Sequence, residues 1–316
     1  MQSPDTTTKP MTKLSQNAFI RCVKKKYALY LLLLPTLIAT LYFSYLPMIG
    51  TVIAFQDYDI FGGIFHSDWV GLKHFINIFT VPDFSKSILN TLYLSALNLL
   101  ITQPAPLIFA LLLNEIRVQK FKRTIQTVSY LPHFLSYIAV IGLAHSIFST
   151  TGVINDLRVS IFGEDTERIR FLASQGFFVP LMMIITVWKS VGWASIIYLA
   201  AITGIDPQLY EAACVDGAGR FKQCLHITVP SVLPTAIMIF IIQIGHVFGD
   251  NFDLVYGLQN PFIEFETIST IVYKHGIKNG NYSASAALGL FQGLAGLLLV
   301  TIANKASKKI NDVALW

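Results

Sequence analysis

Charged residues are scarce in this sequence. Asp, Glu, Lys and Arg make up 13% of the 316 residues, whereas hydrophobic residues make up 53% and the mean hydropathy is +0.57. A soluble globule of this size needs more polar surface than these residues supply. The composition is therefore that of a protein that crosses a lipid bilayer several times.

Cysteine and the common catalytic motifs are also rare or absent. Cys22, Cys214 and Cys224 all fall in segments that we expect to face the cytosol, so a disulfide framework is not indicated. There is no Gly-x-x-x-x-Gly-Lys-[Ser/Thr] loop to hold ATP phosphates, and no His-Glu-x-x-His or Gly-x-Ser-x-Gly motif. We expect no catalytic residue, no metal site and no cofactor on this chain, and no nucleic-acid partner.

Long apolar runs dominate the chain instead. A bilayer core of about 30 Å requires about 20 apolar residues of helix, and lipid offers no partner to an unpaired backbone amide. Six runs are long enough, namely 28–54, 87–113, 125–148, 177–203, 229–249 and 284–303. The sequence thus predicts an all-α membrane protein with six transmembrane helices. It has a transmembrane domain at 28–303, an N-terminal segment at 1–27 and a tail at 304–316.

Lys and Arg are distributed unequally between the connecting segments. Fifteen lie in the N-terminal segment, the second-to-third loop, the fourth-to-fifth loop and the tail, whereas seven lie in the longer loops of the other side. Because basic residues accumulate in cytoplasmic loops, both termini and loop 204–228 are predicted to be cytoplasmic. Lys24–Lys26 directly precede the first apolar run, which is typical of a signal anchor.

Loop 204–228 is a polar segment between two apolar runs. Asp206 followed by Pro207 predicts the start of a short helix. Gly217 suits a left-handed residue that ends this helix. A second short helix is expected from Arg220 to Leu225, before Pro230 opens the next apolar run. Two short helices joined by a glycine would form a compact knob that another protein can bind.

At this loop the chain resembles the membrane permease subunits of ATP-binding-cassette (ABC) importers. Their shared pattern is Glu-Ala-Ala, a glycine six residues after the Glu, and then an Ile and a Leu-Pro pair. The matching residues here are Glu211, Ala212, Ala213, Gly217, Ile227 and Pro230, with Val229 in place of Leu and Cys224 where the sugar-transporting branch usually has an aromatic residue. Segments 45–50, 54–58, 71–75, 130–134, 188–193 and 282–304 also resemble carbohydrate-importing permeases, especially the branch for complex oligosaccharides such as alginate-type and pectin-type fragments.

The resemblance implies a type I importer fold in a bacterial plasma membrane. The chain would be one permease of a heterodimer, with two ATPase subunits that use ATP and Mg and an extracellular or periplasmic solute-binding protein that delivers a carbohydrate. It would have no ATPase site of its own. The residues implied to couple to the ATPase are Glu211, Ala212, Ala213, Asp216, Gly217, Arg220 and Phe221.

Two groups of polar and aromatic residues within the spans are candidates for the substrate pathway. Lysine at mid-membrane costs roughly 3 kcal/mol on insertion scales, so Lys189 is expected either to line a cavity or to pair with an acid of a neighbouring subunit. Aromatic rings and amides suit sugars, because rings stack on pyranoses and amides bind hydroxyls; interhelical hydrogen bonding is the alternative. The candidates are Trp188, Lys189, Trp193 and Tyr198 on the fourth span, and Gln243, His246, Asp250 and Asn251 on the fifth.

Other interpretations remain open from the sequence. The aromatic loop 55–86, with a short amphipathic helix at 71–79, fits either an interfacial belt or a docking surface for an external partner. A secondary transporter driven by an ion gradient should show inverted repeats or broken helices with titratable groups, and Lys189 alone is thin support. A membrane-bound glycosyl- or lipid-modifying enzyme needs clustered carboxylates or metal ligands, which the scattered acids do not supply.

Overall fold

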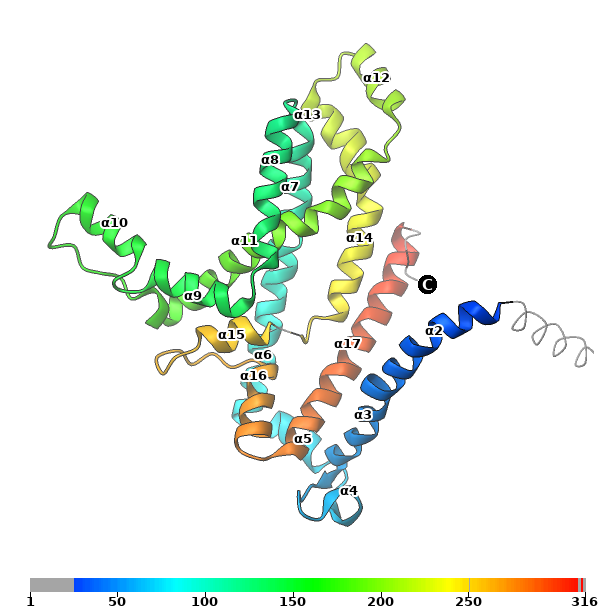
Figure 1. Cartoon of the computed structure of the whole chain (residues 1–316), viewed down its shortest axis with the longest axis vertical. Helices are drawn as coiled ribbons and strands as arrows, with labels where there is room; N and C mark the ends of the chain where they lie inside the picture. The colour runs from blue at the N-terminus through cyan, green and yellow to red at the C-terminus, as the bar shows by residue number, and fades with distance from the viewer. Residues whose placement is uncertain (1–25, 250, 312–313, 315–316) are drawn as a thin grey trace, which may run out of the picture. The chain divides into compact units, whose positions relative to one another are not determined.

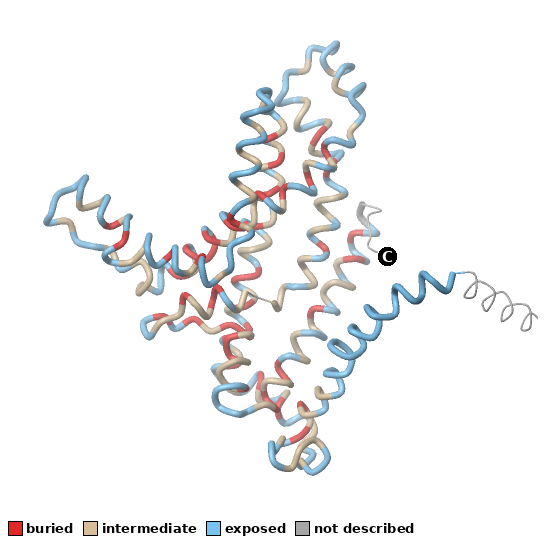
Figure 2. The backbone as a smooth tube through the Cα atoms, viewed as in Figure 1, coloured by how far each residue is buried: buried red, intermediate tan, exposed pale blue. Residues whose placement is uncertain are grey.

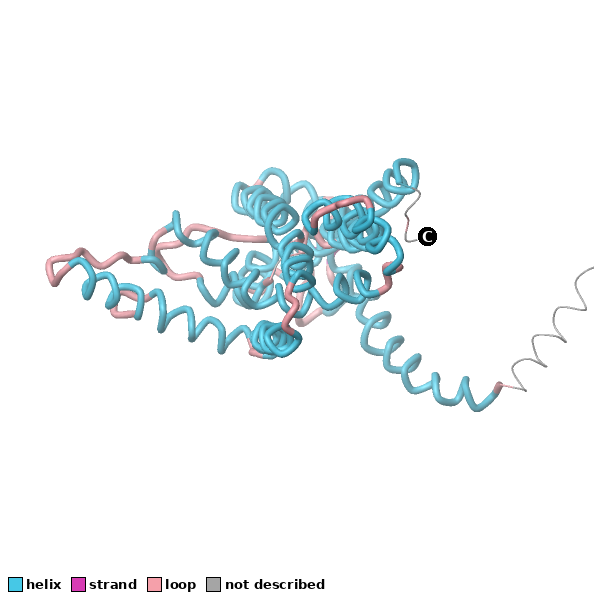
Figure 3. Tube along the Cα trace, turned by 90° about the horizontal axis from the view of Figure 1, so that it is seen from above, coloured by secondary structure: helices cyan, strands magenta, loops and turns pink. Residues whose placement is uncertain are grey.

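The computed structural model describes residues 26–249, 251–311 and 314, and most of them are helical (Figure 3). The segment 1–25, with Cys22 and most of the predicted basic anchor, and residue Asp250 lie outside the described part. Six described segments are long and apolar enough to cross a membrane, namely Tyr27–Phe55, Pro82–Glu115, Tyr137–Phe162, Gln175–Thr203, Arg220–Gly245 and Tyr282–Lys309. The predicted all-α membrane fold is confirmed.

The chain divides into two units, 1–53 and 54–316, which are described separately. In the first unit, α2 (Tyr27–Thr40) continues through the π-helical turn η1 (Leu41–Tyr45) into α3 (Leu46–Ile49), and the 3₁₀ helix η2 (Gly50–Phe55) follows. The π turn precedes Pro47, which cannot donate a backbone hydrogen bond, so the wider turn accommodates the missing donor.

The second unit begins with a small two-stranded element and the second span. The two-residue strands β1 (Gln56–Asp57) and β2 (Asp68–Trp69) pair antiparallel around α4 (Gly63–His66). Helix α5 (Lys73–Thr80) confirms the short helix predicted at 71–79. The second span then runs through α6 (Pro82–Leu97), the π turn η3 (Asn98–Thr102) and α7 (Pro104–Glu115).

The third predicted span, 125–148, is not one helix. Helix α8 (Gln119–Tyr130) ends in the 3₁₀ turn η4 (Leu131–Phe134), and α9 (Tyr137–Phe148) and α10 (Val153–Phe162) follow. Pro132 removes a backbone donor and blocks a continuous helix, and the Ser136 side chain caps α9 by accepting from the amide of Ala139 at 3.2 Å. The candidate membrane segment therefore shifts to Tyr137–Phe162.

Helix α11 (Gln175–Thr203) follows the short 3₁₀ helix η5 (Phe171–Ala173) and agrees with the predicted fourth span. It contacts α7, α8 and α14 (Figure 1). After α12 (Pro207–Val215), the helix α13 (Arg220–Gln223) runs without a break through the π turn η6 (Cys224–Thr228) into α14 (Val229–Gly245). The predicted second short helix of the loop is thus the N-terminal end of the fifth span, and the π turn accommodates Pro230.

The chain ends with α15 (Phe252–Leu258), α16 (Ile268–Ile271), the π turn η7 (Val272–Lys278) and the long α17 (Tyr282–Asn311). Buried residues of the second unit form three clusters where helices cross (Figure 2). One cluster joins α9, α11 and α15, another joins α5, α6, α16 and α17, and the third joins α7, α11 and α14. Many large apolar side chains stay exposed between them, as lipid-facing surfaces require.

Candidate functional site

A cavity of about 540 Å³ lies among the second, fourth and fifth spans. Its walls come from α6, η3 and α7 on one side, α11 on another, and α14 with the start of α15 on the third. The lining residues are Ser95, Asn98, Leu99, Thr102, Gln103, Pro106, Thr186, Ser190, Trp193, Ala194, Ile197, Tyr198, Ile239, Gln243, His246, Val247, Gly249 and Asn251. The cavity is therefore mixed in character, with amides, hydroxyls and aromatic rings set among aliphatic side chains.

Five of the eight predicted pathway residues line this cavity. They are Trp193, Tyr198, Gln243, His246 and Asn251. Asp250 lies outside the described residues, and Trp188 and Lys189 are not part of the cavity wall. The grouping supports a shared site, and its role in transport stays a prediction.

Several polar groups in the cavity wall are available to a ligand. The side chains of Gln103, Gln243 and His246 form no hydrogen bond with another described residue and line the cavity. Amides and imidazole can both donate and accept, so they match the hydroxyls of a sugar. The Asn251 side chain is partly engaged, because its Oδ1 accepts from the amide of Leu254 at 3.2 Å and caps α15.

The aromatic part of the wall is held by stacking. Trp193 stacks on the imidazole of His133 with ring centroids 4.7 Å apart and planes 3° apart, and Phe134 meets Trp193 edge-on at 5.5 Å. His133 and Phe134 belong to η4, the break in the third span. The bend at Pro132 therefore sets the orientation of a cavity-lining ring.

Lys189 lies behind the cavity wall and secures this same bend. Its side chain is buried, and its Nζ donates to the carbonyl oxygens of His133 at 2.8 Å and Leu135 at 2.7 Å, with Pro132 O at 3.4 Å. The ammonium also lies 4.8 Å from the ring centroid of Tyr137. Lys189 is not part of the cavity wall, so the predicted cavity-lining role does not match this placement, whereas an ion pair with an acid of a neighbouring subunit stays a prediction. Within this chain, the carbonyls freed by the helix break are the hydrogen-bond acceptors of Lys189.

The contact between α8 and α11 is close at the same level. A Cβ added at Gly192 would lie 2.1 Å from the carbonyl oxygen of Ser129, a distance that no side chain tolerates. Glycine therefore allows the two backbones to approach, as small residues do at helix crossings in membranes. Gly192 and Lys189, three residues apart on α11, together join the fourth span to the broken third.

Six other polar residues line the cavity and are not among the eight predicted pathway residues: Ser95, Asn98, Thr102, Gln103, Thr186 and Ser190. Ser95 Oγ donates to the carbonyl oxygen of Val247, which ties the second span to the end of the fifth. Thr102 Oγ1 donates to Asn98 Oδ1 at 3.1 Å. Ser and Thr on a helix usually bond the preceding turn, so the sequence gives little signal of a cavity-facing role.

The first half of loop 204–228, up to Gly217, has the predicted local structure. The Asp206 carboxylate accepts from the amide of Gln208 at 2.9 Å and caps α12. Gly217 has φ of +74°, so the chain turns there in a conformation that favours glycine. The Gln223 amide donates to the carbonyl oxygen of Ala218 at 2.9 Å and closes the turn. The Oη of Tyr210 and Oγ1 of Thr228, 2.9 Å apart, join α12 to η6.

The surface of this loop is exposed and partly apolar. Phe221 is 76% exposed and Val215 is 88% exposed, and Glu211, Asp216 and Arg220 are exposed beside them. Arg220 Nη1 lies 3.4 Å from Glu115 Oε2 at the end of α7, so the loop is also linked to the second span. Large apolar side chains among charges are typical of a protein-binding surface. Among the described residues no group of His, Cys, Asp and Glu is arranged to hold a metal ion.

Comparison with known proteins identifies the class. Residues 84–308 match the family described as "Binding-protein-dependent transport system inner membrane component", and the chain belongs to that family. It is a multi-pass permease subunit of an ABC importer in the bacterial inner membrane, and the predicted family and membrane location are confirmed.

Two related permeases and one solved transporter structure show which transporters this chain resembles. The chain is 46% identical to the polygalacturonan/rhamnogalacturonan transport system permease protein YteP of Bacillus subtilis, over 94% of this chain and 92% of that protein. It is 42% identical to the protein LplB of Bacillus subtilis, over 95% and 94% of the two chains. A crystal structure of a bacterial ABC transporter that imports the acidic polysaccharide alginate matches with a TM-score of 0.84 and 37% identity, covering 93% of this chain and 99% of that one.

Proposed function

We propose that this chain forms one half of the translocation pathway for an acidic oligosaccharide, of the kind released from pectin or alginate. The observation that carries this proposal is the cavity in which Trp193, Tyr198, Gln103, Gln243 and His246 meet. Aromatic rings can stack on pyranose rings while the free amides and imidazole bind hydroxyls. Relatives named for polygalacturonan and alginate transport favour a substrate that carries carboxylates.

The proposed complex has a second permease, two ATPase subunits and a solute-binding protein. The related alginate transporter has been crystallised with a periplasmic protein that carries an alginate pentasaccharide, which supports delivery by a binding protein here. ATP and Mg would be used by the ATPase subunits, and this chain would bind neither. The second permease would close the open side of the cavity.

In this proposal loop 204–228, which contains α12 and is called the α12 loop below, faces the cytoplasm and binds an ATPase. Closure of the nucleotide dimer moves α12, and the hydrogen bond between Tyr210 and Thr228 and the Arg220–Glu115 pair carry the motion to the fifth and second spans. Coupling of this kind requires two arrangements of the bundle that ATP and the loaded binding protein both bias.

The test is uptake of a labelled galacturonate trisaccharide by the complete complex in proteoliposomes. Uptake that requires ATP and all four kinds of subunit supports the proposal. Uptake by the lone chain that follows a proton gradient would instead establish a secondary transporter. Competition with a neutral trisaccharide of the same ring number reports whether carboxylates contribute to recognition.

A further inference from the structure

A second cavity lies at the opposite end of α14 from the α12 loop. Its volume is about 490 Å³, and its walls come from the end of α15, the loop that follows it, and η7. The lining residues are Tyr256, Gln259, Asn260, Pro261, Ile263, Lys274 and Lys278. It therefore combines an aromatic ring, two amides and two lysines, and it is separate from the cavity among the spans.

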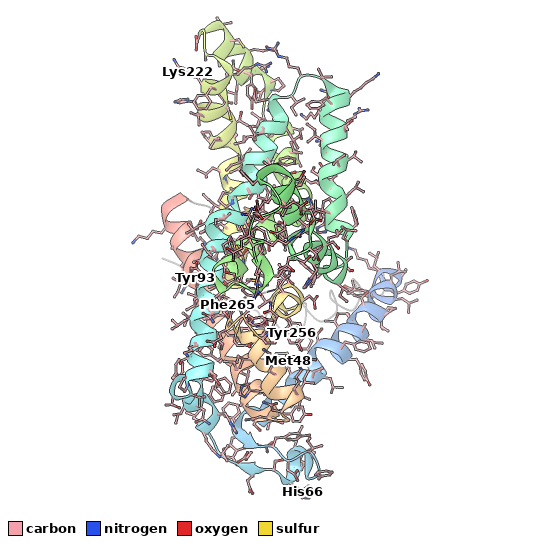
Figure 4. All side chains as sticks on the ribbon, turned by 90° about the vertical axis from the view of Figure 1, so that its left-hand side faces the viewer. Met48, His66, Tyr93, Lys222, Tyr256 and Phe265 are labelled. Carbon is pink, nitrogen blue, oxygen red and sulfur yellow. The ribbon has the colours of Figure 1, made fainter. Side chains whose placement is uncertain are left out.

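The aromatic wall of this second cavity belongs to a fixed cluster. Phe252 and Tyr256 are stacked with centroids 5.2 Å apart and planes 12° apart, and Tyr273 packs against both rings at 5.2 and 5.0 Å. Tyr256, labelled in Figure 4, is only partly buried. A partly exposed ring held by two others is a rigid platform on which a flat, apolar sugar face can rest.

Within the part of the chain that the structure describes, one cation at this platform forms no ion pair with an acid. Lys274 pairs with Glu266, so its charge is balanced. The Lys278 ammonium instead donates to the neutral Tyr256 Oη at 2.7 Å and lies 5.3 and 5.6 Å from the ring centroids of Tyr256 and Tyr273. An ammonium has three donors, so two N–H groups of Lys278 remain for an anion.

Hydrogen bonds hold the polar side of the second cavity in place. Asn260 donates to the carbonyl oxygen of Leu172 at 2.7 Å, and Gln175 Oε1 accepts from the amide of Glu264 at 2.9 Å, so the loop is fastened to the start of α11. Gln259 donates to the carbonyl oxygen of Phe265 at 2.5 Å, whereas its Oε1 is buried with no partner among the described residues.

Helix α15 connects the two cavities. Asn251, which caps its start, lines the cavity among the spans, and Tyr256 near its end lines the second one. Seven helical residues span roughly 10 Å. The two cavities are therefore separated by a distance that a short oligosaccharide can cover.

We propose that this second cavity is a subsite for one uronate residue of the entering oligosaccharide. Tyr256 supports the pyranose ring, and Lys278 binds the carboxylate. This inference rests on the proposed function and adds to it a specific place where charge is recognised.

The experiment compares two probes in the complete reconstituted complex: galacturonate trisaccharide, and the same trisaccharide with its carboxyls reduced to alcohols. Lys278→Gln is expected to raise the apparent KM for the acidic probe about fivefold, as the loss of an exposed ion pair predicts, with an unchanged maximal rate and an unchanged KM for the neutral probe. Lys278→Arg should retain the preference. Lys73→Gln, at an exposed lysine paired with Asp57 on another loop, is the matched control and should behave as wild type.

Two results would overturn this inference. If Lys278→Gln leaves the ratio of acidic to neutral uptake at the wild-type value, the second cavity does not recognise the carboxylate. If it lowers the maximal rate equally for both probes, Lys278 belongs to a docking surface for the binding protein. A wild-type complex that takes up neither probe but transports another solute would reject the proposed function itself.

Discussion

Lys189 Nζ on α11 lies 2.7 Å from the carbonyl oxygen of Leu135, across the break between α8 and α9. The same ammonium reaches the carbonyl of His133, whose ring stacks on the cavity-lining Trp193. A lysine in the middle of an apolar helix therefore takes carbonyls of its own chain as hydrogen-bond acceptors. Its place in the protein is that of a support for the cavity wall, one layer behind the surface that a ligand would touch.

Replacing Lys189 with Met should lower the stability of the purified permease. Two carbonyls of the η4 bend would lose a charge-assisted partner, and each buried unsatisfied acceptor costs about 1–3 kcal/mol. The loss of the costly buried charge offsets part of this. Thermal unfolding in detergent measures the change, with Lys73→Met as the exposed control. An unchanged melting temperature would contradict the support role.

Gly192→Val should prevent α8 and α11 from packing. The added side chain would overlap the backbone of Ser129, which cannot move as a flexible side chain can, so we expect a loss of about 3 kcal/mol or failure to fold. Gly176→Val, on the same helix with nothing within 4 Å of the added Cβ, is the control. Yield and thermal unfolding of the two variants measure the difference. Equal stability would show that the crossing is looser than the structure has it.

Gly217→Val tests, through backbone strain alone, whether the turn at Gly217 couples ATP hydrolysis to transport. No atom lies within 4 Å of an added Cβ, but φ of +74° costs a β-branched residue about 1–2 kcal/mol, so α12 should change its orientation. ATP hydrolysis by the complex should become uncoupled from uptake, while membrane insertion stays normal. Gly219→Val is the matched control, because that glycine has equal space and a φ of −67°. Normal coupling in both variants would count against the turn as a coupling element.

How much of the fold and of the candidate site the sequence predicts depends on how far apart in the chain the interacting residues lie. Hydropathy predicts six spans because lipid leaves a backbone no alternative to helix, although it places the third at 125–148 and not at Tyr137–Phe162. The Asp206 cap and the Gly217 turn are local and are also predicted. The partners of Lys189 are carbonyls 54 to 57 residues away, created by a bend at Pro132. Pro230 was expected to separate two helices, but the π turn before it keeps one helix continuous. Such compensation by a neighbouring turn leaves no pattern in residue types.

The contact between Lys278 and Tyr256 in the second cavity predicts how Tyr256 ionises as pH rises. The hydrogen bond from the Lys278 ammonium, and then the positive charge of that ammonium, lower the pKa of Tyr256 below its usual value of 10.0. The same hydrogen bond raises the pKa of Lys278. As pH rises, Tyr256 should therefore ionise before an ordinary tyrosine and pair with a lysine that is still charged. In Lys278→Gln the Tyr256 pKa should rise. Tyrosinate absorbance, taken as the difference from Tyr256→Phe, measures both; identical titrations would show that the contact is absent.

The most direct measurement of the central claim uses Cys214, a free and exposed cysteine on α12. In a Cys22→Ser, Cys224→Ser background, a membrane-impermeant maleimide should label Cys214 only from the cytoplasmic side of membrane vesicles, and the bound ATPase subunit should protect it. Phe61→Cys, at a side chain that is 98% exposed on the opposite face, is the external control. Labelling of Cys214 from outside intact cells, or equal labelling with and without the ATPase, would contradict the claim that this loop couples ATP hydrolysis to transport.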